Sequence, residues 1–315
     1  MLGNREQLSI IENMAHSGNV PHAIMITGEQ GMGKKTLAEA FCVALFGGSE
    51  KDKKRILERN FPDIIRVTHE KPAVISVDDI RDQITDTVTI KPYESGFKVY
   101  IVDEAEKMNQ YAQNALLKTL EEPPEYCIII MLVTDDRMML DTIRSRSMKL
   151  NLYPVREDEI AGFLLEQGID EEVARIAAAF SGGNTGRAIG LSESEEFKDN
   201  YKRVVNICKN ISRMEGAAIV GLAEETVNEC DNLQEFFDMV EIWYHDALRL
   251  KSTGSVEGVR FKGELNALKA TQGVGNTAVI TEACEQCRRR LRSNVNKEAS
   301  LMHLFFVMKD AKNRF

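Results

Sequence analysis

The sequence lacks any long apolar run. No stretch approaches the roughly 20 apolar residues that a membrane-spanning helix requires. The first residues also lack the basic start and small-residue cleavage site of a secretory signal. We therefore expect a cytoplasmic protein with no membrane contact. The 315 residues suffice for about two or three domains, and 43% hydrophobic and 28% charged residues are ordinary for a globular chain.

Cysteine is scarce and is not arranged for zinc. The six cysteines include one CxxC pair, Cys284 and Cys287, and the five histidines form no HExxH pattern. A structural zinc site needs four ligands, so this pair is at most half a site. We expect no zinc and no other metal site, with both thiols buried in a helix and kept reduced.

The chain also lacks an excess of positive charge, since its net charge is −9. Affinity for DNA comes largely from neutralising phosphates, so this balance argues against strong stand-alone DNA binding. Two basic runs are local exceptions, Lys51 to Arg55 and Arg288 to Arg292. Each is either a DNA contact or, as charge runs more often are, a solvated or partner-facing surface.

What the sequence does contain is an alternation of short apolar runs with helical patterns. The runs predict strands at residues 23–27, 61–68, 98–102, 127–133 and 148–152. Helices are expected at 34–46 and at 77–88, the second capped by Ser76. Continuous apolar strands suit a parallel sheet covered on both faces, so residues 1–153 are predicted to form a three-layer α/β domain.

The pattern changes after Pro154. Three short helical segments with glycine stops predict a small helical lid over residues 154–198. Residues 199–315 are helical throughout, with apolar residues at helical spacing, and are predicted to form a C-terminal helical domain. The fold class expected is thus α/β plus all-α.

The segment GEQGMGKKT, residues 28–36, fits the phosphate-loop pattern G-x-x-x-x-G-K between a strand and a helix. Its lysine, Lys34, would reach the terminal phosphates. The next position normally holds Ser or Thr for Mg²⁺, but here it is Lys35. Thr36 comes one residue late, a rotation of about 100° on a helix. The loop is therefore a weak ATP or ADP binder or a relic that turns the chain, in preference to a competent ATPase loop.

A second segment carries matching chemistry. The apolar run Val99–Val102 leads into Asp103 and Glu104, a helix reading AQNALLKTLEEPP follows at 112–124, and another apolar strand precedes Arg144-Ser145-Arg146-Ser147. With the glycine loop, these motifs resemble the nucleotide-binding module of bacterial clamp-loader subunits, which belong to the AAA+ class. Within that family the chain resembles the delta-prime subunits of DNA polymerase III.

The resemblance implies a role for each motif. The expected degenerate nucleotide site comprises Gly28, Gly31, Gly33, Lys34, Lys35, Thr36, Asp103, Glu104, Thr134 and Arg187. In working relatives the aspartate supports Mg²⁺, the glutamate positions water, and Thr134 and Arg187 stand where the two sensors stand. Arg146 would be an arginine finger acting in trans on a neighbouring subunit's ATP.

Plainer alternatives accompany these roles. The two carboxylates at 103 and 104 would then only cap the next helix. Arg146 would be an ordinary surface arginine, and Arg144 is a rival for the finger. Arg187 would either contact phosphate or pack between domains.

The sequence of the glycine loop also helps to distinguish a motor subunit from a non-hydrolysing subunit. Motor subunits, gamma or tau, carry an intact GKT or GKS and four zinc cysteines after the first helix. This chain reads GKKT and has no cysteine in residues 47–61. The resemblance therefore implies a largely non-hydrolysing subunit that needs no cofactor. Its Arg146 would enter the ATP site of a neighbouring motor subunit.

The resemblance also implies partners: gamma or tau and delta subunits in a hetero-oligomer with a helical collar, with the sliding clamp and primed DNA reached through the complex. Such a subunit is an enzyme only by association with the DNA polymerase holoenzyme. It is not expected to polymerise DNA or hydrolyse ATP alone. The alternative is an active gamma- or tau-like motor ATPase. A nucleotide kinase is disfavoured, because it leaves the LLKTLEEPP helix and Arg146 without a role.

Overall fold

The computed structural model describes residues 2–69, 71–271, 274–292 and 296–310. Packing divides the chain into two compact units. The first consists of Met1–Ile160 with Gly183–Arg187, and the second of Ala161–Gly182 with Ala188–Phe315. The expected three domains, 1–153, 154–198 and 199–315, are a division by sequence pattern and stay a prediction.

The first unit is built on a five-stranded parallel sheet with the order β2-β3-β4-β1-β5. Its strands are β1 Ala23–Thr27, β2 Ile64–Arg66, β3 Lys98–Val102, β4 Cys127–Val133 and β5 Met148–Asn151. Strands β3 and β4 are buried along their whole length. Burial on both faces explains why these strands read as unbroken apolar runs.

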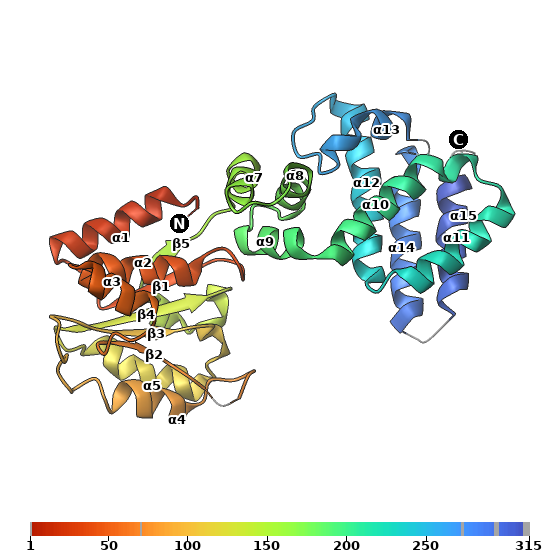
Figure 1. The fold of residues 1–315 in the computed structure, drawn as a ribbon. Helices are drawn as coiled ribbons and strands as arrows, with labels where there is room; N and C mark the ends of the chain where they lie inside the picture. The colour runs from red at the N-terminus through yellow and green to blue at the C-terminus, as the bar shows by residue number, and fades with distance from the viewer. Residues whose placement is uncertain (1, 70, 272–273, 293–295, 311–315) are drawn as a thin grey trace. The chain divides into compact units, whose positions relative to one another are not determined.

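Helices cover both faces of this sheet, which confirms the predicted three-layer α/β architecture (Figure 1). Successive side chains of a strand point to opposite faces. Ile24 and Ile26 therefore pack with α1 and α2, whereas Met25 packs in the cluster formed with α4 and α5. The helices of this layer system are α1 Arg5–Ser17, α2 Lys34–Phe46, α3 Glu50–Leu57, α4 Val77–Ile80, α5 Gln110–Glu121 and α6 Asp141–Arg146.

Two predicted elements are shorter than expected. The strand expected at 61–68 covers only β2, because Asp63 turns its side chain back to accept hydrogen bonds from the backbone of residues 93–95. The helix expected at 77–88 begins with the Ser76 capping box but continues as a π-helical turn at Arg81–Thr85 and ends there. The threonines that follow disfavour a longer helix.

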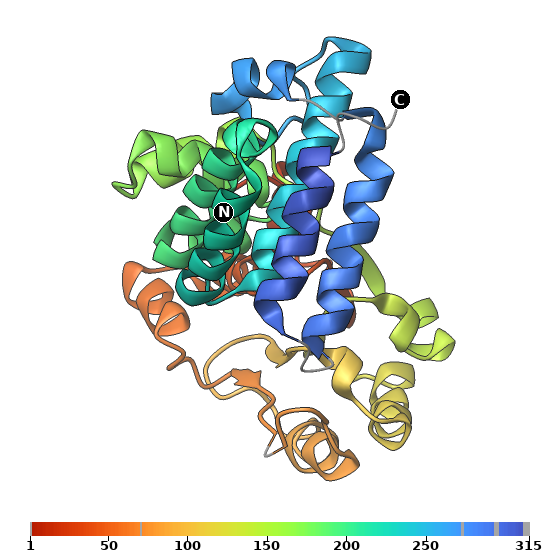
Figure 2. The same cartoon turned by 90° about the vertical axis from the view of Figure 1, so that its right-hand side faces the viewer.

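The second unit is helical. Its elements and the lid helices are α7 Glu157–Glu166, α8 Glu171–Phe180, α9 Thr185–Glu193, α10 Glu195–Asn210, α11 Gly216–Glu229, α12 Leu233–Thr253, α13 Leu265–Ala270, α14 Thr277–Arg292 and α15 Lys297–Asp310. The last helix expected from the sequence began at residue 294, and 294–295 lie outside the described residues. Figure 2 shows α14 and α15 running side by side.

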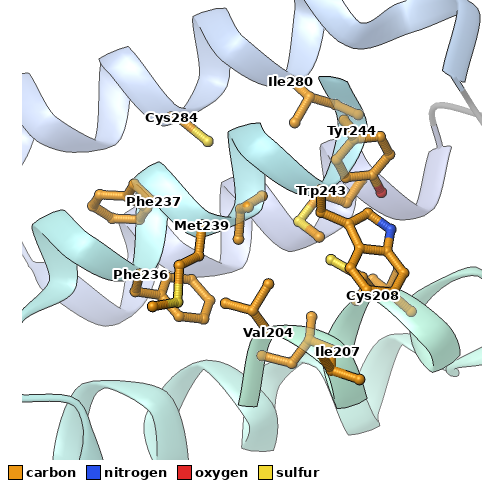
Figure 3. Packing of buried hydrophobic residues seen from close by; sticks show 14 of the residues in the cluster. Val204, Ile207, Cys208, Phe236, Phe237, Met239, Trp243, Tyr244, Ile280 and Cys284 are labelled. Carbon is orange, nitrogen blue, oxygen red and sulfur yellow. The ribbon is translucent and has the colours of Figure 1, made fainter. Parts of the chain in front are cut away.

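The core of this unit centres on α12. Figure 3 shows Val204 and Ile207 of α10 facing Met239 and Trp243 of α12, with α14 contributing Cys284. Trp243 is completely buried, and its Nε1–H donates to Thr271 Oγ1 at 3.0 Å. An indole that is buried and hydrogen-bonded in this way combines a large apolar contact with a satisfied polar group.

One residue of the basic run Arg288 to Arg292 is buried, namely Arg288. Its side chain is only 6% exposed and pairs with Asp238 at 2.6 Å, Glu241 at 2.8 Å and Glu285 at 2.7 Å. A solvated or DNA-facing role for this residue is therefore wrong. The reason is helical spacing, since Arg288 lies four residues after the buried Cys284 on the same face of α14.

The described helices include none that is long and apolar enough to cross a membrane. All six cysteines are free and buried, and Cys287 Sγ donates to the Ser300 carbonyl oxygen at 3.0 Å. Within the described parts of the chain, no group of three or more His, Cys, Asp and Glu side chains is placed to hold a metal ion.

Candidate functional site: a modified phosphate loop

Several residues of the predicted nucleotide site lie at the carboxyl ends of three adjacent strands. Strand β1 leads into the glycine loop, β3 into Asp103 and β4 into Thr134. Because the strands are parallel, these three ends lie on one edge of the sheet, where ligands of α/β proteins bind. Gly28 N–H donates to the Val133 carbonyl oxygen at 3.1 Å, which ties the loop to the end of β4.

The glycine loop has the backbone conformation that its glycines allow. Gly33 has φ +94° and directly precedes α2, and Gly31 has φ +90°. A side chain on Gly31 would also bring its Cβ within 2.6 Å of Asn184 Oδ1. The loop therefore requires glycine at both positions.

Lys34 is turned onto its own loop. Its ammonium donates to Gly28 O at 2.5 Å, Glu29 O at 3.2 Å and Thr134 Oγ1 at 3.3 Å, so all three of its donors are engaged. Burial lowers the pKa of Lys34, although Glu106, Asp103 and Glu104 act against that shift. A phosphate would have to exchange with the loop carbonyl oxygens to reach this lysine.

Lys35 forms an ion pair with Asp103. Its Nζ lies 2.6 Å from Asp103 Oδ2, and the two side chains are 63% and 35% exposed. Asp103 is the residue that supports Mg²⁺ in active relatives by the resemblance described above. In this chain its carboxylate already has a cationic partner from the position that should carry a hydroxyl.

Glu104 is engaged in the same manner. Its Oε2 lies 2.6 Å from Lys107 Nζ, which also donates to the Pro72 carbonyl oxygen at 2.9 Å. The backbone of Glu104 has φ +49°, one of three positive values at non-glycine residues in the described chain. Such strained conformations concentrate at functional sites.

Glu106 and Thr134, which follow β3 and β4, are joined by a hydrogen bond. Glu106 Oε1 accepts from the Thr134 backbone N–H at 3.2 Å. Its Oε2 is buried and has no hydrogen-bond partner within the described residues. Thr134 thus contacts Lys34 through its hydroxyl and Glu106 through its backbone amide.

The segment with the second predicted sensor belongs to the same unit as the loop. Asn184 Nδ2 donates to the Gln30 carbonyl oxygen at 2.7 Å, and Gly186 N–H donates to Gly31 O at 2.9 Å. Asn184 Oδ1 accepts from the Arg187 N–H at 3.0 Å and so caps α9. Arg187 itself is exposed beside the loop.

Thr36 does not join the site. It is exposed on α2, and no side-chain hydrogen bond of Thr36 occurs within the described ranges. A magnesium ion therefore does not fit these residues, since position 35 offers an ammonium and the Asp103 carboxylate is paired with it.

Arg146 lies apart from this edge, at the last residue of α6. Its side chain is 40% exposed, and Nη2 lies 3.0 Å from Glu121 Oε1 at the end of α5. The pair borders a cavity of about 500 Å³ that is also lined by Pro21, His22, Leu120 and Pro123. Arg144, the rival, is paired with Asp141 on its own helix.

Three residues of the site were not anticipated: Glu106, Lys107 and Asn184. Glu106 and Lys107 sit in a short 3₁₀ turn after β3, and their partners depend on how the loops fold. Asn184 gave one usable signal, since asparagine before a helical run is a common N-cap. Its second contact, to Gln30, joins positions 154 residues apart and has no sequence signature.

Comparisons with known proteins place these features in a family. A family model described as DNA polymerase III, delta subunit, matches residues 3–156. The DNA polymerase III subunit delta' of Bacillus subtilis is 26% identical over 320 residues, covering 96% of this chain and 95% of that protein. A DNA polymerase III gamma subunit of Buchnera aphidicola is 31% identical over 208 residues, 61% of this chain and 56% of that protein.

Among solved structures, a gamma subunit-related protein of Thermotoga maritima covers 98% of this chain and 100% of its own, with 17% identity and a TM-score of 0.46. The sequence matches extend from the glycine loop through the arginine motif, and one of them continues over nearly the whole chain. They confirm the resemblance stated from the motifs. Together, the family model and the match over nearly the whole chain support an assignment to the delta-prime clamp-loader family of DNA polymerase III.

Proposed function

We propose that this protein serves as the delta-prime subunit of a clamp loader, a largely non-hydrolysing member that supplies Arg146 to a neighbouring motor subunit. The ion pair between Lys35 and Asp103 carries this proposal. Phosphoryl transfer depends on positioning and electrostatics, with a metal ion that neutralises the developing charge. A paired Asp103 is a poor support for that ion.

The second catalytic carboxylate is compromised in a similar way. Glu104 is the expected water-positioning residue, and its ion pair with Lys107 draws the side chain toward the 3₁₀ turn. A glutamate bound to an ammonium is a weaker hydrogen-bond acceptor for an attacking water. Two separate contacts therefore oppose hydrolysis in this subunit's own site.

The Arg146 side chain is exposed enough to donate hydrogen bonds to a neighbouring subunit. It is at a helix end beside an open cavity, and its partner Glu121 is itself half exposed. Exposed ion pairs contribute about 0 to 1 kcal/mol, so a phosphate on a neighbouring subunit can compete for this guanidinium. Arg144 is less exposed, at 30%, and is tied within α6.

The partners proposed follow from the family. They are gamma or tau motor subunits and a delta subunit, with the sliding clamp and primed DNA reached through the assembled complex in the cytoplasm. The helical second unit, with its continuous core around α12, is proposed to supply the collar contacts. Weak binding of ATP or ADP by the loop is compatible with this role.

An active motor ATPase is the second candidate. It is favoured by Gly28, Gly33 and Lys34, which keep the loop pattern, and by the 31% identity to a gamma subunit. Purified protein tests the choice directly. We expect negligible ATP turnover with primed DNA and clamp present. Turnover on the order of one per second or faster, typical of working enzymes and abolished by Lys34→Ala, would favour the motor.

A further inference from the structure

Lys35 occupies the sequence position that carries the Ser or Thr ligand of Mg²⁺ in phosphate loops. It is the second residue of α2, where a hydroxyl would otherwise face the metal, and its ammonium contacts Asp103. Mg²⁺ gives up its water reluctantly and requires near-octahedral oxygen ligands. It would have to displace the ammonium and would still lack the hydroxyl ligand.

The surroundings of the pair also disfavour a doubly charged cation. A cavity of about 190 Å³ borders Lys35 and Asp103, and it is further lined by Arg59, Arg66, Glu39 and Thr68. Three cationic side chains thus face two carboxylates. Arg66 lies 3.4 Å from Glu39, which leaves Asp103 with the ammonium of Lys35. Among the side chains that line this cavity, the excess of positive charge disfavours Mg²⁺ and favours an anion.

The lysine has donors to spare. An ammonium group has three N–H donors, and the described contacts of Lys35 use one of them, on Asp103. Lys34, in contrast, has all three donors on Gly28, Glu29 and Thr134. The two remaining donors of Lys35 are therefore available to phosphate oxygens of a nucleotide bound at the loop.

We propose that the loop takes ADP or ATP as a metal-free anion, with the Lys35 ammonium in place of Mg²⁺. The ammonium carries one positive charge and holds Asp103 on one side and phosphate oxygens on the other. This inference rests on the weak nucleotide binding included in the proposed function. It adds that the binding is independent of divalent metal, and it identifies the residue that makes it so.

The test is a fluorescence titration of the full-length protein with N-methylanthraniloyl-ADP, once in EDTA and once in excess Mg²⁺. For the wild type we expect the two dissociation constants to agree within about twofold. Lys35→Thr restores the hydroxyl and frees Asp103, so its dissociation constant should be about tenfold lower in Mg²⁺ than in EDTA.

Lys35→Gln is the matched control, because it removes the charge without supplying a hydroxyl. It should bind the probe more weakly than the wild type in both buffers and gain no dependence on Mg²⁺. All three proteins should unfold at the same temperature, since the side chain is 63% exposed.

Wild-type binding that Mg²⁺ tightens about tenfold, or no wild-type binding in either buffer, would overturn the proposal. A Lys35→Thr variant that ignores Mg²⁺ would overturn it as well. None of these results touches the role of Arg146, which is measured on the assembled complex, so failure here and failure of the proposed function are distinguishable.

Discussion

Arg146 is held by Glu121, with 3.0 Å between Nη2 and Oε1. The two residues end neighbouring helices, and the glutamate belongs to the LEEPP segment that the sequence singled out. Arg146 Nη1 also donates to the Thr142 carbonyl oxygen at 3.1 Å. In the isolated subunit the arginine is therefore folded back on its own chain, and it must leave Glu121 to reach another subunit's phosphate.

Glu121→Gln should make this release easier. The change keeps the shape of the side chain but removes the charge that holds Arg146, so ATPase of the reconstituted complex should stay equal or rise, by no more than about fivefold. Glu122→Gln is the control, because it changes the adjacent carboxylate. A loss of complex ATPase with Glu121→Gln, with assembly intact, would show that the pair serves the active state instead.

Asn184→Ala should loosen the phosphate loop. It removes the cap of α9 and leaves the Gln30 carbonyl oxygen without its donor. The free energy of unfolding of the first unit should fall by about 1 to 3 kcal/mol, measured by urea denaturation. Asn184→Asp keeps the capping oxygen and loses only the donor, so it should lose less. Equal stability of Asn184→Ala and wild type would show that these contacts are unimportant.

Arg288→Ala should destabilise the second unit strongly. The substitution leaves Glu241 half buried without its charge partner, and breaking such a pair costs about 3 to 5 kcal/mol. Arg290→Ala, two residues along α14 and less buried, should change the free energy of unfolding by less than about 0.5 kcal/mol. Similar denaturation curves for the two variants would contradict the buried network.

Acid should weaken the first unit through Asp63. Burial disfavours its charge, but hydrogen bonds from the backbone of residues 93–95 and from the Ser95 hydroxyl outweigh burial and lower its pKa below 3.8. A lowered folded-state pKa stabilises the protein above the unfolded value, and that stability is lost as the pH falls through the folded value. Asp63→Asn should be less stable at neutral pH and lose less stability between neutral and acidic pH. An unchanged pH dependence in the variant would contradict this account.

Much of the sheet could be predicted from sequence, because buried parallel strands must be apolar throughout. Strands at 23–27, 98–102 and 127–133 and the helix at 34–46 have the expected bounds. The strand at 61–68 was overestimated, since nothing local shows that Asp63 folds back to residues 93–95. The burial of Arg288 in α14 could have been predicted, because this residue shares a helix face with Cys284.

For the candidate site as well, some features could be predicted from the sequence and others could not. The resemblance placed Gly28, Asp103 and Thr134 in one site, and parallel strands do bring their carboxyl ends to one edge. It did not predict that Lys107 binds Glu104, or that Glu121 binds Arg146, because both contacts depend on turns and helix ends whose geometry is set by the tertiary fold. The departure at Lys35 was visible in sequence, but its partner Asp103 was not.

The central claim is that Arg146 acts on a neighbour's ATP while this subunit's own site is inactive. The direct measurement is DNA-stimulated ATPase of the complex reconstituted with Arg146→Ala or with Arg144→Ala, beside wild-type motor and delta subunits. Arginine fingers contribute about 10³ to 10⁵ in rate at a single site, and the other sites of the complex will mask part of that loss. The account predicts normal assembly and reduced ATPase and clamp loading for Arg146→Ala, with a smaller effect for Arg144→Ala. Unchanged activity with Arg146→Ala in a fully assembled complex would contradict it.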